Sequence, residues 1–260
     1  MNIKIILFTL ALNLSFNLAF NQAAMANDNG AVSNFPSEAL SDIEHPSEDV
    51  PSLADVMFHK AHIENEIGKD IESNAQILSG DSLMASYSHI DPKRMIPSGL
   101  LKKALSVYHS NKASFANKNY LTIVNFSARS NLKRMFLIDM KSGQVQAVRT
   151  AHGAGGDRDH DGRVESLGNV PNSKKSSRGF YKVAEIYSGK YGRSIRLDGL
   201  SKSNSKARSR AIVIHGSNGV KEANVIQGRS WGCFSLAWSV KDSIVSRISG
   251  GSLLYADWNQ

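Results

Sequence analysis

The stretch LTIVNFSARSNLKRMFLIDMKSGQVQAVRT, residues 121–150, sets the expected fold class of this chain. Leu121–Phe126 and Arg134–Asp139 are short apolar runs rich in β-branched and aromatic residues, which favour strands. The turn residues Lys141-Ser142-Gly143 follow, and Gln144–Thr150 then alternates apolar and polar residues. The last two runs are therefore expected to pair as a β-hairpin.

The same pattern of short apolar runs separated by turn residues continues towards the C-terminus, with few helical stretches. Further strands are expected at Phe180–Tyr187, Ser194–Leu197, Arg210–Ile214 and Leu253–Ala256, and helices at Leu53–Leu78, Ser98–Tyr108 with Ser98 as N-cap, and Val240–Ile248. This pattern predicts a mainly β fold, a β-sandwich or barrel with a few short helices. A helical or extended N-terminal segment is expected to precede it.

The N-terminal residues predict export. Met1–Lys4 carries one positive charge, Ile5–Phe20 is mostly apolar, and Ala24-Met25-Ala26 has the small-x-small pattern of a signal-peptidase site. The apolar run is short for a membrane anchor, the alternative, and its Asn residues would be costly in lipid. We therefore expect a cleavable signal peptide over residues 1–26, no stable membrane insertion after cleavage, and a periplasmic location or secretion to the cell wall.

The mature chain divides into two parts by composition. Residues 27–97 are expected to be a polar linker with a helical segment, since their first half is rich in Ser, Asn, Asp, Glu and Pro. Residues 98–260 are expected to form the main folded domain. The net charge of +8 is spread in small clusters. Together with export, this argues against nucleic acid as a partner.

The chain has one cysteine, Cys233, so it has no internal disulfide. A lone thiol in an oxidising compartment is buried, paired between chains or chemically needed. His215 follows the apolar run Ile212-Val-Ile214, at the expected end of a strand, and the loop Gly228-Arg-Ser-Trp-Gly-Cys233 comes next. An imidazole beside a thiol takes its proton, which predicts Cys233 as nucleophile and His215 as base. The N–H groups of Gly232 and Cys233 are the expected oxyanion donors.

These residues resemble a known family. His215, fourteen intervening residues, and then Ser230-Trp-Gly-Cys-Phe-Ser235 resemble the L,D-transpeptidases, and Gly228-Arg-Ser-Trp-Gly-Cys233 resembles the motif G-R-S-x-G-C of the branch called murein L,D-transpeptidase catalytic domain family proteins, which is YkuD-like. Other matching segments are Asn125-Phe-Ser127 with Ser130 and Arg134, His152-Gly153, Ser176–Tyr181, Gly192–Leu197, and Ala207 with Arg210. The resemblance covers roughly residues 100–260.

The resemblance implies an L,D-transpeptidase-like β-sandwich or barrel and a cysteine acyltransferase that acts on tetrapeptide stems of peptidoglycan. Cys233 would form an acyl-enzyme and release D-Ala. Ser230 would orient the histidine or support the loop, while Arg229, Trp231 and Gly216 are assigned to substrate binding. Acylation of Cys233 by a carbapenem is a further expectation. The chain departs from many relatives at Trp231, where they have His, and at Ser235, where they have Asn.

Three alternatives remain open at this stage. The same site would serve an L,D-carboxypeptidase or another hydrolase if water resolved the acyl-enzyme. The fold would serve a non-catalytic cell-wall-binding domain, or a secreted cysteine protease of general specificity. The sequence predicts no cofactor and no metal at the catalytic site, because His215 and Cys233 lack the spacing of paired zinc ligands.

One acidic motif is separate from this chemistry. Asp157, Asp159 and Asp161 followed by Gly162 resemble the start of a calcium-binding loop, but Gly168 stands where a bidentate Glu is expected. A solvated acidic loop is the favoured interpretation, and calcium binding is the alternative. His152 lies in a Gly-rich stretch, where a hydrogen-bonded structural role is expected.

Overall fold

The structure, a computed structural model, describes residues 71, 80–258. The predicted signal peptide, most of the predicted linker and, apart from Ile71, the helix expected at Leu53–Leu78 lie outside the described residues. Within the described part, no helix is both long enough and apolar enough to cross a membrane. The described residues all belong to one compact unit.

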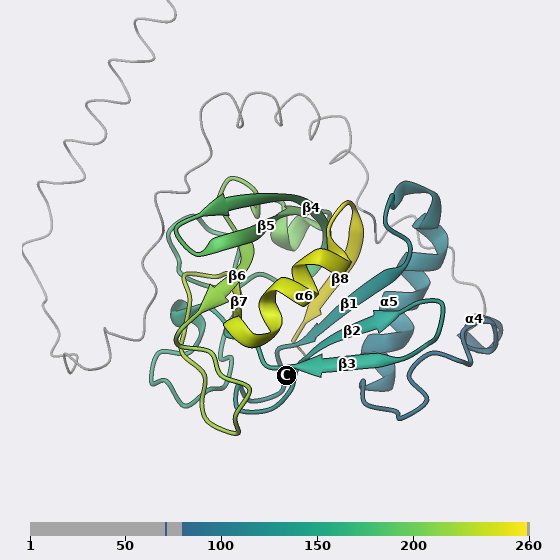
Figure 1. Ribbon diagram of the computed structural model, residues 1–260, viewed down its shortest axis with the longest axis horizontal. Helices are drawn as coiled ribbons and strands as arrows, with labels where there is room; N and C mark the ends of the chain where they lie inside the picture. The colour runs from purple at the N-terminus through teal and green to yellow at the C-terminus, as the bar shows by residue number, and fades with distance from the viewer. Residues whose placement is uncertain (1–70, 72–79, 259–260) are drawn as a thin grey trace, which may run out of the picture. The chain divides into compact units, whose positions relative to one another are not determined.

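The centre of this unit is a single curled sheet with the strand order β3-β2-β1-β8-β4-β5-β6-β7 (Figure 1). Its strands are β1 (Tyr120–Asn125), β2 (Met135–Asp139), β3 (Val145–Val148), β4 (Gly179–Gly189), β5 (Gly192–Gly199), β6 (Val213–Ser217), β7 (Phe234–Ala237) and β8 (Ser252–Asp257). The pairs β1–β8 and β6–β7 are parallel and the others antiparallel. The mainly β prediction is confirmed.

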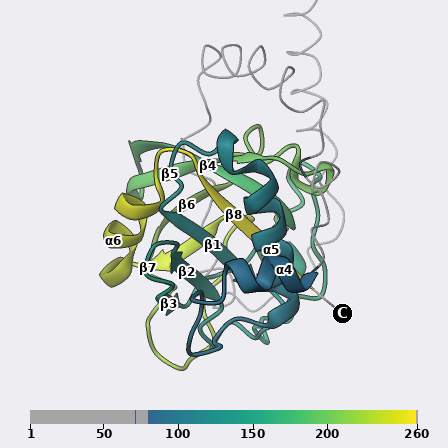
Figure 2. The same cartoon turned by 90° about the vertical axis from the view of Figure 1, so that its right-hand side faces the viewer.

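Each face of the sheet is covered by one helix, α5 (Ser98–Asn111) or α6 (Trp238–Ile248). Figures 1 and 2 show the two helices on opposite sides of the sheet. The alternation along β1 explains this arrangement: Leu121 and Ile123 pack with α5, whereas Val124 packs in the cluster that contains α6. Each apolar side chain that is fully buried in these clusters contributes about 1.5–3 kcal/mol.

The described part of the predicted linker also contributes to the core. The helix α4 (Gly80–Ser86) precedes α5, and Leu83, Ile90 and Ile96 are buried in the cluster that α5 shares with the sheet. The Asp91 carboxylate fixes the connection, since it accepts hydrogen bonds from the backbone N–H groups of Met95 and Ile96 at 2.9 and 2.8 Å. Compact packing therefore includes residues on the N-terminal side of residue 98.

The hairpin expected within residues 134–150 is confirmed, because β2 and β3 pair antiparallel around Gly143 at φ +76°. The prediction of Ser98 as N-cap is wrong. The N-cap is Pro97, whose carbonyl accepts the hydrogen bond from Leu101 N–H at 3.1 Å, and Ser98 is the first helical residue.

The expected strand Arg210–Ile214 is displaced towards the C-terminus. Ala211 has φ +52°, and β6 begins only at Val213 and runs on to Ser217. His215 therefore lies in the middle of a strand, not at its end. The cause is the parallel pairing of β6 with β7, a four-residue strand that local sequence does not reveal.

Candidate functional site

Cys233 lies directly before β7, at the end of a segment that we name the cysteine loop, residues 228–233. Its side chain is half-buried, and Sγ lies 3.5 Å from the carbonyl oxygen of Ala211. The preceding Gly232 has φ +123°, and a Cβ there would lie 2.8 Å from the carbonyl oxygen of Lys175. The chain therefore reaches the cysteine by a turn that only glycine accommodates.

His215 is brought to the cysteine by strand register. It lies opposite Ser235 in the β6–β7 pair, and Cys233 precedes Ser235 by two positions. Residues opposite each other in a parallel pair share one face, so His215 and Ser235 lie on the same face, and Cys233 lies immediately before the strand that carries Ser235. The face is distinct from that of Ile214 and Phe234, which are buried in the core. Register thus places the predicted base opposite the residue two positions after the predicted nucleophile.

The hydrogen bonds of His215 define its tautomer. Nδ1 lies 2.9 Å from the carbonyl oxygen of Gly216, which only accepts, so Nδ1 carries the proton. In the neutral ring Nε2 is then the unprotonated nitrogen, and it lies 3.1 Å from Ser235 Oγ. His215 is buried, and the ring of Tyr191 packs on it with centroids 4.5 Å apart. In the neutral ring, Nε2 thus carries the lone pair that can accept a proton.

Ser235 and Tyr191 were not among the site residues predicted from sequence. Ser235 stood out only as a departure from Asn at the corresponding position of relatives. Tyr191 comes from the turn between β4 and β5, and no local motif marks it. Strand pairing and ring packing, neither of which is local in sequence, place both residues against His215.

Ser230 supports the cysteine loop. Its Oγ donates to the carbonyl oxygen of Cys233 at 2.8 Å and accepts from Gly232 N–H at 3.1 Å. Of the two roles predicted for Ser230, the loop role is the one these contacts serve. The N–H of Gly232 is already bonded to Ser230 Oγ. It must therefore break this hydrogen bond before it can donate to an oxyanion, as predicted.

A guanidinium group lies next to the cysteine loop. Arg210 donates to the carbonyl oxygens of Gly168 and Lys175 at 2.9 and 2.5 Å, and Nη2 lies 3.3 Å from the position of a Cβ on Gly232. Burial lowers the pKa of Arg210, while the negative charges of ionised Tyr181 and Cys233 act in the opposite direction. By reciprocity, the Arg210 cation favours the thiolate form of Cys233.

The three residues assigned to substrate binding have different surroundings. Arg229 is buried, and its Nη1 donates to the carbonyl oxygens of Asp157 and Arg158 at 2.5 and 3.2 Å. Trp231 is half-buried under the ammonium of Lys174, 4.3 Å from the ring centroid. These contacts favour the structural role for Arg229 and leave Trp231 at the edge of the site.

Gly216 serves the packing around His215. A Cβ on Gly216 would lie 2.5 Å from the ring of Trp238, so the absence of a side chain admits the indole. The Trp238 Nε1–H donates to Asn218 Oδ1 at 2.9 Å, and the side chain is exposed. Trp238 thus packs on Gly216, and Tyr191 packs on the adjacent His215.

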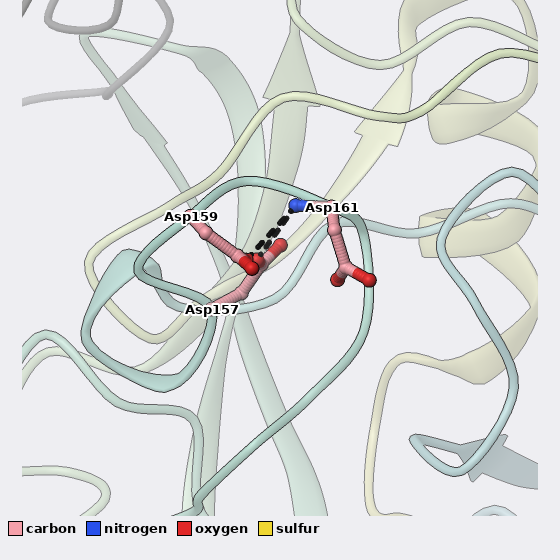
Figure 3. Close-up of side chains that lie close together, drawn as sticks. All are labelled: Asp157, Asp159 and Asp161. Carbon is pink, nitrogen blue, oxygen red and sulfur yellow. Dashed lines mark hydrogen bonds between the residues drawn. The ribbon is translucent and has the colours of Figure 1, made fainter.

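The acidic motif folds as a tight turn, in which one oxygen of each carboxylate lies within 4.8 Å of the others (Figure 3). Asp159 is exposed and Asp161 half-buried, as a solvated loop requires, whereas Asp157 is fully buried, contrary to that interpretation. Its oxygens accept from His152 Nε2 at 2.9 Å and from the N–H groups of Asp161 and Gly162 at 3.1 and 3.2 Å. The buried carboxylate of the motif is therefore satisfied by hydrogen-bond donors of this chain.

Comparison with known proteins places these observations in a family. Residues 93–256 match the family model described as "L,D-transpeptidase catalytic domain". Among curated proteins, none matches the chain.

The solved structures that are similar to this chain include L,D-transpeptidases of low sequence identity. One from Mycobacterium smegmatis is 10% identical, with a TM-score of 0.34, and the match covers 54% of this chain and 58% of that chain. One from Stackebrandtia nassauensis is 11% identical, with a TM-score of 0.35 and coverage of 75% and 92%. The structure of "LD transpeptidase LdtMt1 in complex with imipenem" is 10% identical, with a TM-score of 0.34 and coverage of 54% and 59%. The chain thus spans less than two thirds of the length of two of these three structures.

Proposed function

Because the chain belongs to the L,D-transpeptidase catalytic domain family, we propose that it is an exported cysteine acyltransferase that acts on the tetrapeptide stems of peptidoglycan. The observation that supports the proposal is the position of the only thiol, Cys233, directly before β7 and two residues from Ser235, which lies opposite His215 in the β6–β7 pair and contacts its Nε2. In this proposal residues 1–26 direct export to the periplasm or the cell wall.

The first half-reaction forms a thioester. His215 Nε2 takes the thiol proton, and Cys233 Sγ attacks the carbonyl carbon of the third stem residue. The tetrahedral oxyanion is held by the backbone N–H of Cys233, joined by that of Gly232 when it leaves Ser230. The C–N bond then breaks, His215 returns the proton to the departing nitrogen, and D-Ala leaves with a free amine.

The second half-reaction transfers the acyl group. An amine of a second stem attacks the thioester carbonyl carbon, and His215 accepts the proton that this amine loses. The C–S bond breaks, and Cys233 leaves as a thiolate, whose charge the nearby Arg210 stabilises. If water replaces the amine, the same steps release a tripeptide stem, which is the L,D-carboxypeptidase alternative.

The experiment is mass spectrometry of disaccharide-tetrapeptide muropeptides after incubation with the full mature chain. Release of D-Ala with formation of crosslinked dimers supports a transpeptidase, and tripeptide without dimers identifies a carboxypeptidase. Cys233→Ala and His215→Gln are expected to abolish both products. Ser239→Ala, an exposed serine on α6, is the control and is expected to retain activity.

A carbapenem gives a second readout. Imipenem is expected to add its full mass to the wild-type chain, since the thiolate opens the β-lactam ring without a leaving group, and to leave Cys233→Ala unmodified. If the chain gave no muropeptide product and no Cys233-dependent adduct, the proposal would be contradicted. That result would favour a non-catalytic wall-binding domain.

A further inference from the structure

Three ionisable side chains form a buried line behind the cysteine loop. Arg134, His152 and Asp157 are 0%, 1% and 0% exposed. Arg134 Nη2 lies 2.6 Å from His152 Nδ1, and His152 Nε2 lies 2.9 Å from Asp157 Oδ2. None of the three belongs to the cysteine–histidine pair, and the reaction steps above do not use them.

The line has a fixed direction. A guanidinium group only donates hydrogen bonds, so His152 Nδ1 must accept and Nε2 must carry the proton that it donates to Asp157. Burial, together with the positive charge of Arg134, lowers the pKa of His152 to about 4, which keeps the ring neutral at physiological pH. The two hydrogen bonds therefore define one tautomer and one orientation of the ring.

Both ends of the line are anchored on backbone. The Arg134 guanidinium donates to the carbonyl oxygens of Thr150 and Ala128, at 2.8–3.0 Å, and lies 5.5 Å from the centroid of the Phe126 ring. The Phe126 ring in turn stacks on Phe234, the residue after Cys233. At the other end, the Asp157 carboxylate is held by backbone N–H groups of its own turn.

The segment that carries His152 is hydrogen-bonded to both sides of Cys233. Four bonds join residues 150–154 to Ser230 and Ser235: Ser230 N–H to His152 O at 2.9 Å, Ala154 N–H to Ser230 O at 2.8 Å, Ala151 N–H to Ser235 O at 3.1 Å, and Thr150 Oγ1–H to Ser235 O at 3.0 Å. Ser230 supports the cysteine loop, and Ser235 contacts His215 Nε2. A displacement of His152 would therefore shift Ser230 and Ser235, and with them the surroundings of both the nucleophile and the base.

We propose that Arg134, His152 and Asp157 are positioning residues, which hold residues 150–154 so that Ser230 and Ser235 fix the cysteine loop against His215. The inference rests on the proposed function of Cys233 and His215. A buried ion pair with a bridging imidazole is a weak source of stability compared with apolar packing. Its contribution is to fix geometry. When every donor and acceptor in the network is paired, the three side chains have only one arrangement.

The test is the rate of Cys233 alkylation by iodoacetamide as a function of pH, measured on the folded chain. His152→Leu removes both hydrogen bonds of the ring. His152→Gln restores one acceptor and one donor, which can face Arg134 and Asp157. Phe115→Leu is the control for lost stability, since Phe115 is buried in the cluster on the other face of the sheet. All variants are compared at a temperature where circular dichroism shows them folded.

We expect His152→Leu to lower the alkylation rate at neutral pH by about tenfold and to move the pH midpoint upward, because the loop no longer holds Cys233 against its base. His152→Gln is expected to recover the rate to within about threefold of the wild type. Phe115→Leu is expected to lower the melting temperature and leave the alkylation profile unchanged.

A wild-type alkylation profile in folded His152→Leu would overturn the proposal, and so would a loss in His152→Gln equal to that in His152→Leu. Should His152→Leu fail to fold, Asp157→Asn in the same assay decides, with the same expected upward shift and the same overturning result. Alkylation needs no peptidoglycan. Failure of the wild-type chain on muropeptides would therefore count against the proposed function and leave the result on positioning intact.

Discussion

Ser235 is the single side chain that best tests how His215 is activated. Its hydroxyl lies 3.1 Å from Nε2 and is buried, so it supports either protonation state of the ring by donating or accepting. We expect Ser235→Ala to disfavour the imidazolium that forms with the thiolate. Loss of one hydrogen bond to a charged group corresponds to about tenfold in rate. The measurement is the pH profile of Cys233 alkylation by iodoacetamide.

Ser235→Asn is the matched variant, since an amide both donates and accepts, and it is expected to stay close to the wild type. Ser239→Ala, which lies exposed on α6, controls for a change of serine as such. If Ser235→Ala reproduced the wild-type profile, the hydroxyl would have no part in activating the histidine.

At the scale of an element, the cysteine loop depends on the backbone conformation of Gly232. We expect Gly232→Ala to destabilise the folded chain and to slow Cys233 alkylation, because φ +123° is strained for alanine and the new Cβ would lie 2.8 Å from the carbonyl oxygen of Lys175. Strain of this kind costs about 1–3 kcal/mol. Calorimetric melting and the iodoacetamide assay measure the two effects.

Gly250→Ala separates strain from steric conflict. Gly250 has φ +77° and nothing within 4 Å of its Cβ position, and it lies after α6, away from the cysteine loop. It is expected to lower stability without slowing alkylation. Equal alkylation rates for Gly232→Ala and the wild type would show that the loop tolerates a different path.

The sequence predicted correctly those elements that have a strong local pattern of residue types. The hairpin at residues 134–150 and the strands near residues 121, 180 and 253 are marked by β-branched and aromatic runs. The strand β7 is four residues long and is defined by its parallel pairing with β6, so no local signal reveals it or the extension of β6 through His215. The predicted nucleophile and base came from residue type and spacing.

The rest of the site depends on contacts between distant parts of the chain. Tyr191 reaches His215 from the β4–β5 turn. The line from Arg134 to Asp157 joins the residue before β2 to the segment after β3, which the β2–β3 hairpin brings together. Arg134 and His152 were each visible in the sequence as matching positions, but hydrogen bonding between them is a property of the fold.

At the scale of the whole molecule, buried His152 couples the stability of the fold to pH. Its pKa is about 4 in the folded chain and about 6.5 when unfolded, and the groups that face it are Arg134, Asp157 and Arg229. Between these values the unfolded chain binds a proton that the folded chain does not. The contribution is therefore fully present above pH 6.5 and is lost as pH falls towards 4, on the order of 3 kcal/mol. The lowered pKa of Asp157 acts in the same direction at still lower pH.

The comparison of wild type with His152→Gln isolates this proton from the other titrating groups. Urea unfolding at pH 7, 6, 5 and 4.5 is expected to give a free energy of unfolding that falls more steeply for the wild type, by up to one proton's slope, about 1.4 kcal/mol per pH unit. Since glutamine does not titrate, the two curves converge towards acid pH. Parallel curves would mean that the imidazole takes up its proton equally in both states, which its burial between a guanidinium and a carboxylate opposes.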